Sequence, residues 1–172
     1  YYRVFNIAQC EGITAPDATP FLPINFSPIE AAEEIVKAYA DAPAIEHGGM
    51  RAFYRPSSDS VRLPEPTRFA STEDYYATIF HELAHSTGHS KRLDRGLDSD
   101  PQPFGSPDYG KEELVAEMAA AFLSAHAGIK PVTIDNQAAY IGGWLKQLRQ
   151  DKKLVIAAAG AAQKASDWIR GF

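Results

Sequence analysis

The sequence predicts a single α+β domain in which a small, mostly antiparallel sheet packs on several helices. Segments rich in aromatic and β-branched residues, which are typical of strands, lie within the first 63 residues. Amphipathic helical patterns bounded by capping residues fill most of the remaining chain. The chain has 172 residues, of which 45% are hydrophobic, so it is long enough to bury one substantial core. We find no internal repeat, and residues 1–172 are expected to form one domain.

Three short segments are expected to be strands. Residues 2–8 form the first. Residues 51–55 and 60–63 form a hairpin around a turn at 56–59, where proline, serine and aspartate gather. The strand at 60–63 is a candidate edge against which an extended peptide can pair.

The first helix is expected to begin with a capping pattern. Ser27 is the candidate N-cap, Pro28 stands at the first helical position, and Glu30 completes a capping box. Residues 41–43 end in a proline and are expected to stop this helix.

A second helix is expected to begin at Ser71, which forms another capping box with Asp74. It runs to Gly88, a candidate for the residue that follows the helix end. Residues 96–110 are rich in glycine and proline and predict a loop. The later helical patterns lie at 111–127, which Gly128 ends, at 135–150 and at 151–169.

Charge and composition disfavour several classes of function. The formal net charge is -5, whereas a domain that grips phosphates should be basic, so nucleic-acid binding is not expected of this chain itself. Cys10 is the single cysteine, so no internal disulfide can form and a reducing, cytoplasmic compartment is expected. No apolar run approaches the ~20 residues that span a membrane. Because the chain begins with Tyr1 rather than Met, we expect it to be part of a longer protein.

The run His81-Glu82-Leu83-Ala84-His85 carries the clearest chemical signal. Two histidines four residues apart project from one helix face, so both imidazoles can reach a single zinc ion. Glu82 points beside them and can take a proton from a water that the metal activates. The run lies on a capped amphipathic helix, as this chemistry requires. A surface helix with two solvated histidines is the less favoured alternative.

A catalytic zinc needs a third protein ligand and an open position for water. His89 follows His85 by another four residues, but Gly88 is expected to end the helix first. Lys91 stands where metzincins have their third histidine. His89 is therefore interpreted as a residue that supports a ligand or caps the helix end, where a cation is favoured.

Glu113 and Glu117, on the next helix, are better candidates for the third ligand. They are four residues apart at the edge of an apolar stripe, where carboxylates are costly unless they are paired or bind a metal. The alternative is that these glutamates are exposed residues of the first turn, where they complement the helix dipole. This alternative fits Glu112 well and Glu117 poorly. By analogy with thermolysin-like enzymes, Glu113 is the expected ligand and Glu117 orients a metal-bound histidine. The reverse assignment stays open.

Six stretches that span nearly the whole chain, in order, resemble one known family. They are residues 2–9, 45–54, 75–85, 87–95, 112–117 and 139–145. The chain resembles the C-terminal zincin-like metallopeptidase domain of ArdC-type antirestriction proteins, which conjugative plasmids and related mobile elements carry. Ser86 is a departure, because family members usually have an aromatic residue there. The resemblance implies a zincin-like α+β fold and an upstream single-stranded-DNA-binding domain that this chain lacks.

The resemblance implies a zinc-dependent metallopeptidase-type domain in a protein that protects incoming conjugative DNA from host restriction. Zn²⁺ is the expected cofactor, and Mn²⁺ or another divalent metal would also fit in preparations. The expected partners are an unidentified protein or peptide substrate, and DNA only through the upstream domain. No membrane partner is expected. The location implied is the bacterial cytoplasm, of the donor or of the recipient cell.

Metal-assisted peptide hydrolysis is the expected mechanism. The zinc ion polarises the scissile carbonyl, and Glu82 passes the proton of water to the leaving amine. His89, Tyr109 and Lys91 are candidate donors to the oxyanion, and the sequence does not choose among them.

Two other functions remain open at this point. The first is a binding domain that is stapled by a metal without catalysis and inhibits restriction enzymes by contact. The presence of Glu82 argues mildly against it, because a purely structural site needs no base. The second is an accessory part of a DNA-processing protein, such as a primase, which the acidic net charge disfavours.

Overall fold

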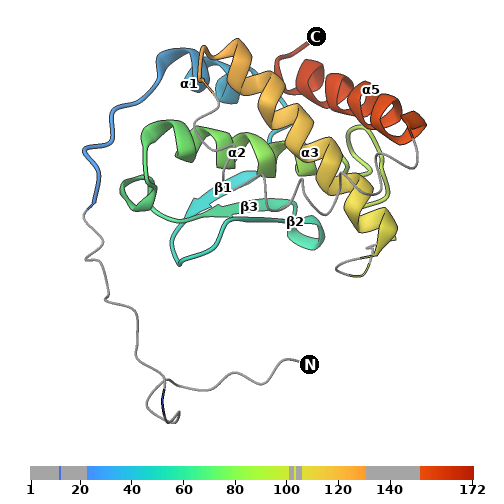
Figure 1. Ribbon diagram of the computed structural model, residues 1–172, viewed down its shortest axis with the longest axis horizontal. Coiled ribbons are helices and arrows are strands. Elements are labelled where there is room, and N and C mark those ends of the chain that lie inside the picture. The colour runs from blue at the N-terminus through green and yellow to red at the C-terminus, as the bar shows by residue number, and fades with distance from the viewer. Residues whose placement is uncertain (1–11, 13–22, 101–102, 104–105, 131–151) are drawn as a thin grey trace.

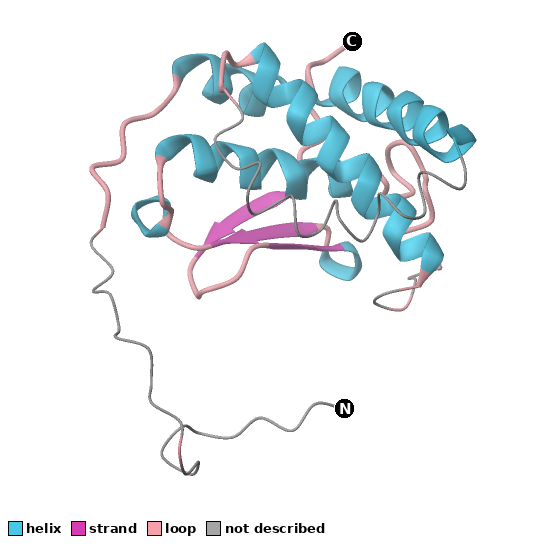
Figure 2. Cartoon of the chain, viewed as in Figure 1, coloured by secondary structure: helices cyan, strands magenta, loops and turns pink. Residues whose placement is uncertain are grey.

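The computed structural model describes residues 12, 23–100, 103, 106–130 and 152–172. A small sheet forms one layer, and the longer helices are stacked on one of its faces (Figures 1 and 2). The predicted strand at 2–8 and the predicted helix at 135–150 lie outside the described residues. The elements in chain order are α1 (Glu30–Ala38), β1 (Ala44–His47), β2 (Phe53–Arg55), the 3-10 helix η2 (Pro56–Ser58), β3 (Ser60–Leu63), the 3-10 helix η3 (Pro66–Arg68), α2 (Thr72–Ser86), α3 (Pro107–His126) and α5 (Lys152–Ile169).

The sheet has the strand order β1-β3-β2. The predicted hairpin forms, because β2 pairs antiparallel with β3. β1, which was not expected, pairs parallel with β3, with Ala44 opposite Ser60 and His47 opposite Leu63. The α+β class is therefore confirmed, with a mixed sheet. The expectation that residues 60–63 form a sheet edge is wrong, because β3 is the central strand.

The core lies between the sheet and α2. Val61 and Leu63 of β3 are fully buried, as are Tyr76, Phe80 and Leu83 of α2. Burying large apolar and aromatic side chains is the main favourable term in folding, so this contact holds α2 on the sheet. α3 packs on α2, and α5 packs on α3, so α3 lies between the two other helices (Figure 1).

Local sequence signals explain how α2 begins and ends. The Ser71 hydroxyl accepts a hydrogen bond from the Asp74 N–H at 3.1 Å, as the capping pattern predicts. Thr87 is the C-cap residue of α2, so Gly88 does follow the helix end. However, Gly88 is not left-handed. A Cβ atom there would lie only 2.6 Å from Cδ1 of Leu97, so glycine is needed for the close approach of the following loop.

Two predicted helix starts are wrong. α1 begins at Glu30 with Ile29 as its N-cap, and no side chain caps it, so the Ser27 prediction fails. α3 begins at Pro107, one turn before the expected residue 111, because the Ser106 hydroxyl accepts from the Tyr109 N–H at 3.1 Å.

The end of α3 follows the sequence prediction. Gly128 has a φ of 70°, a left-handed conformation that glycine adopts without strain, and it comes directly after the C-cap residue Ala127. The helices in the described ranges include none that is long and apolar enough to cross a membrane.

Candidate metal centre

Helix α2 brings the two histidines of the motif together. His81 and His85 are four residues apart, so both project from the helix face that meets α3. Their Nε2 atoms lie 3.1 Å apart, and their side chains are 19% and 13% exposed. Two ring nitrogens therefore converge on one point that is nearly sealed from solvent.

Helix α3 adds a carboxylate at the same point. The Glu113 carboxylate oxygens lie 3.6 Å from His81 Nε2 and 3.5 Å from His85 Nε2. One ligand atom from each residue lies within 4.8 Å of the other two. Bonds of ~2.0–2.2 Å to a tetrahedral metal place the ligand atoms ~3.3–3.6 Å apart. The three side chains therefore fit a divalent metal ion, and only small side-chain shifts are needed to bind it.

Glu82 lies beside this cluster and is buried, with 8% of its surface exposed. Burial raises the pKa of its carboxyl group, although the charge of His85 and a backbone hydrogen bond with Tyr54 oppose the change. Tyr54 belongs to β2, which packs on α2, so the carboxyl group lies on the side of the helix near this strand. A carboxyl group with a raised pKa is suited to accept and release a proton near neutral pH.

Glu117 lies on the other side of His81. One carboxylate oxygen of Glu117 is 3.5 Å from His81 Nδ1, while Nε2 of the same ring faces the cluster. Burial and the neighbouring charge of Glu113 raise the pKa of Glu117. A carboxylate in this position can orient the His81 ring through the nitrogen that does not face the cluster.

Glu112 is the residue that the sequence interpretation missed. Its side chain is only 13% exposed, so the expectation of an exposed residue in the first helical turn is wrong. One oxygen lies 3.2 Å from His85 Nδ1, and Arg95 donates to both oxygens at 2.8 and 2.7 Å. A correct prediction that α3 begins at Pro107 would have placed Glu112 in the second helical turn and so would have argued against an exposed first-turn residue.

The two histidines have opposite pKa shifts. Burial lowers the pKa of His81 to about 3, helped by the charge of His85 and opposed by Glu112. Burial acts to lower the pKa of His85 as well. The hydrogen bond and charge of Glu112 act in the other direction, as do the charges of Glu82 and Glu113, and the net result is a raised pKa. His81 is thus neutral, as a metal ligand must be. The negative field that favours a proton on His85 equally favours a divalent cation in the cluster.

The three candidate oxyanion donors are placed differently. The His89 ring is not part of the cluster, because its Nδ1 accepts from the Lys91 N–H at 3.1 Å and its Nε2 lies 3.6 Å from Asp98. The Lys91 side chain is 69% exposed and lies 3.6 Å from Asp59. Tyr109 stands four residues before Glu113 on α3 and so shares its helix face. Of the three, Tyr109 is the one that helical spacing places on the face of a candidate ligand.

Three comparisons with known proteins agree with this geometry. The model of the zincin-like metallopeptidase family matches residues 30–161. Two Escherichia coli proteins named DNA primase TraC are 43% and 42% identical over the whole chain, and y4eC of Sinorhizobium fredii is 39% identical over 98% of it. The antirestriction protein ArdC of plasmid R388 is 34% identical and has solved Mn(II)-bound and metal-free structures, which match with TM-scores of 0.69 and 0.67 over 98% and 96% of the chain.

The chain spans only part of each of these relatives. It covers 11% and 16% of the two TraC proteins, 52% of y4eC, and 60% and 58% of the two ArdC structures. The names of these longer proteins therefore describe more than the matched part. The matched part itself carries the motif of α2, and the chain belongs to the zincin-like metallopeptidase family.

Proposed function

We propose that this chain is a zinc-dependent metallopeptidase domain of an antirestriction protein that protects incoming conjugative DNA. The observation that carries the proposal is the position of Glu82, a buried carboxyl group next to the cluster of His81, His85 and Glu113. A site that only binds metal has no need of such a group. DNA binding belongs, in this proposal, to an upstream domain of the longer protein.

His81, His85 and Glu113 would hold the metal. Two imidazoles and one carboxylate form a ligand set that suits zinc and also accepts other divalent ions. When bound, the ion supplies a Lewis acid that makes water more acidic and polarises a peptide carbonyl. The Mn(II) of the R388 ArdC structure supports a divalent metal, and zinc remains the choice that the ligand set favours.

Glu82 would carry the proton. Its burial makes the charged form costly, so the carboxylate takes a proton readily from water that attacks the peptide carbonyl. The same group then delivers that proton to the amine that leaves.

An extended peptide would lie along β2. In the described part of the chain, β2 pairs with β3 alone, so its other edge is a candidate for pairing with an extended peptide. Because β2 packs on α2, the helix that carries Glu82, this strand passes near the proposed base. A peptide paired there would bring one of its carbonyl groups close to Glu82.

A second function has one observation in its favour. The cluster joins α2 to α3, so a bound metal would staple two helices whether or not any bond is cleaved. In that case the domain would inhibit restriction enzymes by contact.

The test is a Glu82→Gln variant, which keeps the size and polarity of the side chain but removes the base. With zinc bound, we expect hydrolysis of a mixed peptide library to fall by roughly 100-fold or more, while zinc content is unchanged. Glu46→Gln is the matched control, because Glu46 is 63% exposed on β1. If the parent protein binds zinc but cleaves nothing in the library or in restriction enzymes, the second function replaces the first.

A further inference from the structure

Arg95 lies in the loop that follows α2, yet its guanidinium group is tied to both metal-site helices. It donates to the two carboxylate oxygens of Glu112 on α3 at 2.8 and 2.7 Å. It also donates to the Thr87 hydroxyl at 2.8 Å and to the Ala84 carbonyl at 2.9 Å, at the end of α2. A planar guanidinium bound through two parallel hydrogen bonds holds a carboxylate in one orientation.

Glu112, held in this orientation, contacts the ring of His85. Its Oε1 atom lies 3.2 Å from His85 Nδ1. Because the Arg95 guanidinium donates to both oxygens of Glu112, this group is held as a carboxylate, which can only accept. The Nδ1 atom must therefore carry the proton, which leaves a lone pair on Nε2 pointing at His81 and Glu113.

We propose that Arg95 and Glu112 are positioning residues, which fix the ring orientation and tautomer of His85 for metal binding. The inference rests on the metal site of the proposed function and adds two residues that act behind it. A charged acceptor on the far nitrogen makes an imidazole a better ligand, and losing such a partner typically costs 10–100-fold in metal affinity. Through Arg95, the loop that follows α2 sets the affinity of a site to which it contributes no ligand.

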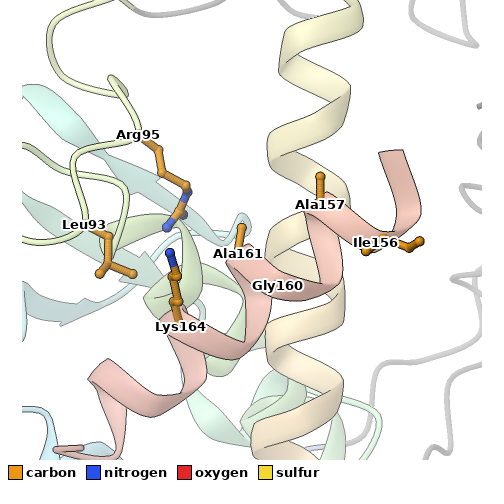
Figure 3. Close-up of a pocket in the computed structure, with 7 residues that line it drawn as sticks. All are labelled: Leu93, Arg95, Ile156, Ala157, Gly160, Ala161 and Lys164. Carbon is orange, nitrogen blue, oxygen red and sulfur yellow. The ribbon is translucent and has the colours of Figure 1, made fainter. Parts of the chain in front are cut away.

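Arg95 also borders a cavity, although its side chain is only 16% exposed. It lines a cavity of about 430 Å³ between this loop and α5, together with Leu93, Ala161 and Lys164. Figure 3 shows the side chains of Arg95 and Lys164 pointing toward one another across this space. A small cation added to the solution can therefore reach the position of a deleted Arg95 side chain.

The experiment measures metal affinity by competition with a chelator, for Zn²⁺ and Mn²⁺ separately, in Glu112→Gln, Arg95→Ala and Arg95→Lys. We expect metal affinity to fall 10–100-fold in Glu112→Gln and Arg95→Ala. Arg95→Lys should have an affinity between those of the parent and Arg95→Ala, because an ammonium cannot form the two parallel hydrogen bonds. Millimolar guanidinium should restore affinity to Arg95→Ala and leave Glu112→Gln unchanged. Arg62→Ala, which removes an exposed arginine 4.0 Å from Glu46, is the matched control and should bind like the parent.

A second readout is independent of bound metal. Nitrogen chemical shifts of the histidine rings in the metal-free protein should show His85 with its proton on Nδ1 in the parent and a mixture of tautomers in Glu112→Gln. Parent affinity in Glu112→Gln and Arg95→Ala, with melting temperatures showing both folded, would overturn the inference. So would a parent protein with the His85 proton on Nε2. A parent protein that binds neither metal would instead overturn the proposed function, so the two failures are distinguishable.

Discussion

The Nε2 atoms of His81 and His85 lie 3.1 Å apart, while the Nδ1 atom of each ring faces a carboxylate. The Glu112 carboxylate, which Arg95 binds through both oxygens, can only accept, so Nδ1 is the favoured site for the proton of a neutral His85 ring. Nε2 of that ring then offers its lone pair to the space beside His81 Nε2 and the Glu113 carboxylate. A divalent cation held there would have all three side chains as ligands, so the arrangement suits metal binding.

Metal removal should therefore destabilise the fold. A metal that binds only the folded state, present at 100 times its dissociation constant, adds about 2.7 kcal/mol of stability. For a domain of this size that corresponds to a rise of roughly 5–10 °C in melting temperature. We expect a chelator to lower the melting temperature of the parent protein by this amount, measured by calorimetry.

Two variants make the chelation experiment specific. His85→Ala should melt at the same temperature with and without chelator, because it lacks a ligand. His126→Ala should respond like the parent protein, since His126 is an exposed residue at the end of α3 that bonds the Phe122 carbonyl. An unchanged melting curve of the parent after verified metal removal would contradict the coupling between metal and fold.

Arg92 and Asp59 should be a major source of stability outside the metal site. Arg92 is 2% exposed, donates to both Asp59 oxygens at 2.8 and 3.0 Å, and also binds the carbonyls of Asp41 and Ser86. Removing one partner of a buried pair leaves an uncompensated charge. We expect Arg92→Ala to lose about 3–5 kcal/mol in the free energy of unfolding, measured with urea.

Lys111→Ala is the control for that loss. Lys111 and Asp108 form an ion pair at 2.6 Å, but both side chains are more than half exposed. Exposed pairs contribute about 0–1 kcal/mol, so this variant should unfold close to the parent. If Arg92→Ala and Lys111→Ala lose equal amounts of unfolding free energy, the Arg92 contacts do not stabilise the fold.

The same pair predicts how stability depends on acid. The hydrogen bonds from Arg92 and Tyr54 outweigh burial and lower the pKa of Asp59 from its ordinary value of 3.8. The native state thus prefers the ionised carboxylate. The contribution of the pair is complete above about pH 3.8 and is lost as the pH falls through the lowered pKa. Asp59→Asn should flatten this part of the stability–pH curve, and a curve as steep as that of the parent would count against the assignment.

Gly88→Ala should disturb the loop that holds Arg95. The added Cβ would lie 2.6 Å from Leu97 Cδ1 and 3.1 Å from an Arg95 guanidinium nitrogen, so these side chains or the loop that carries them have to shift. Overpacking of this kind costs about 1–3 kcal/mol. The double variant with Leu97→Ala should recover part of the loss, because it removes the nearest atoms. Failure of the second substitution to help would show that the contact with Leu97 is not the cause.

The sequence predicted the elements whose determinants are local. The Ser71 cap, the hairpin of β2 and β3 and the Gly128 end of α3 depend on residues that are neighbours in the chain. β1 was missed because it is four residues long and its pairing with β3 joins segments 16 residues apart, from Ala44 to Ser60. Such a pairing leaves no periodic pattern in a short strand.

Within the site, the sequence predicted which helix carries each candidate ligand but not what surrounds the ligands. His81 and His85 follow from helical spacing, and spacing also offers Glu113 and Glu117, between which the analogy with thermolysin-like enzymes favoured Glu113. Glu112 does not, because its partner Arg95 lies 17 residues away in a loop without regular structure. Burial of a carboxylate can be recognised only when the group that neutralises it is known.

The isolated chain should bind single-stranded DNA weakly. Its formal net charge is -5, and nucleic-acid affinity at physiological salt depends mainly on phosphate contacts with cations. We expect no binding below micromolar concentrations by fluorescence anisotropy with an oligonucleotide. Submicromolar binding would place a DNA site in this chain and would contradict the assignment of DNA to an upstream domain.

DNA protection in cells should separate catalysis from metal stapling. In the full-length protein, Glu82→Gln is expected to keep metal content and melting temperature, because Glu82 is not among the three residues of the cluster. His85→Ala should lose both, because it removes a ligand. If proteolysis is the mechanism, both variants should fail to protect incoming DNA from restriction, measured by transfer efficiency into a restricting host. If the domain acts by contact, Glu82→Gln should protect as well as the parent while His85→Ala fails. A buried base with a raised pKa beside the cluster favours the first outcome, since a staple gains nothing from a costly buried carboxyl group.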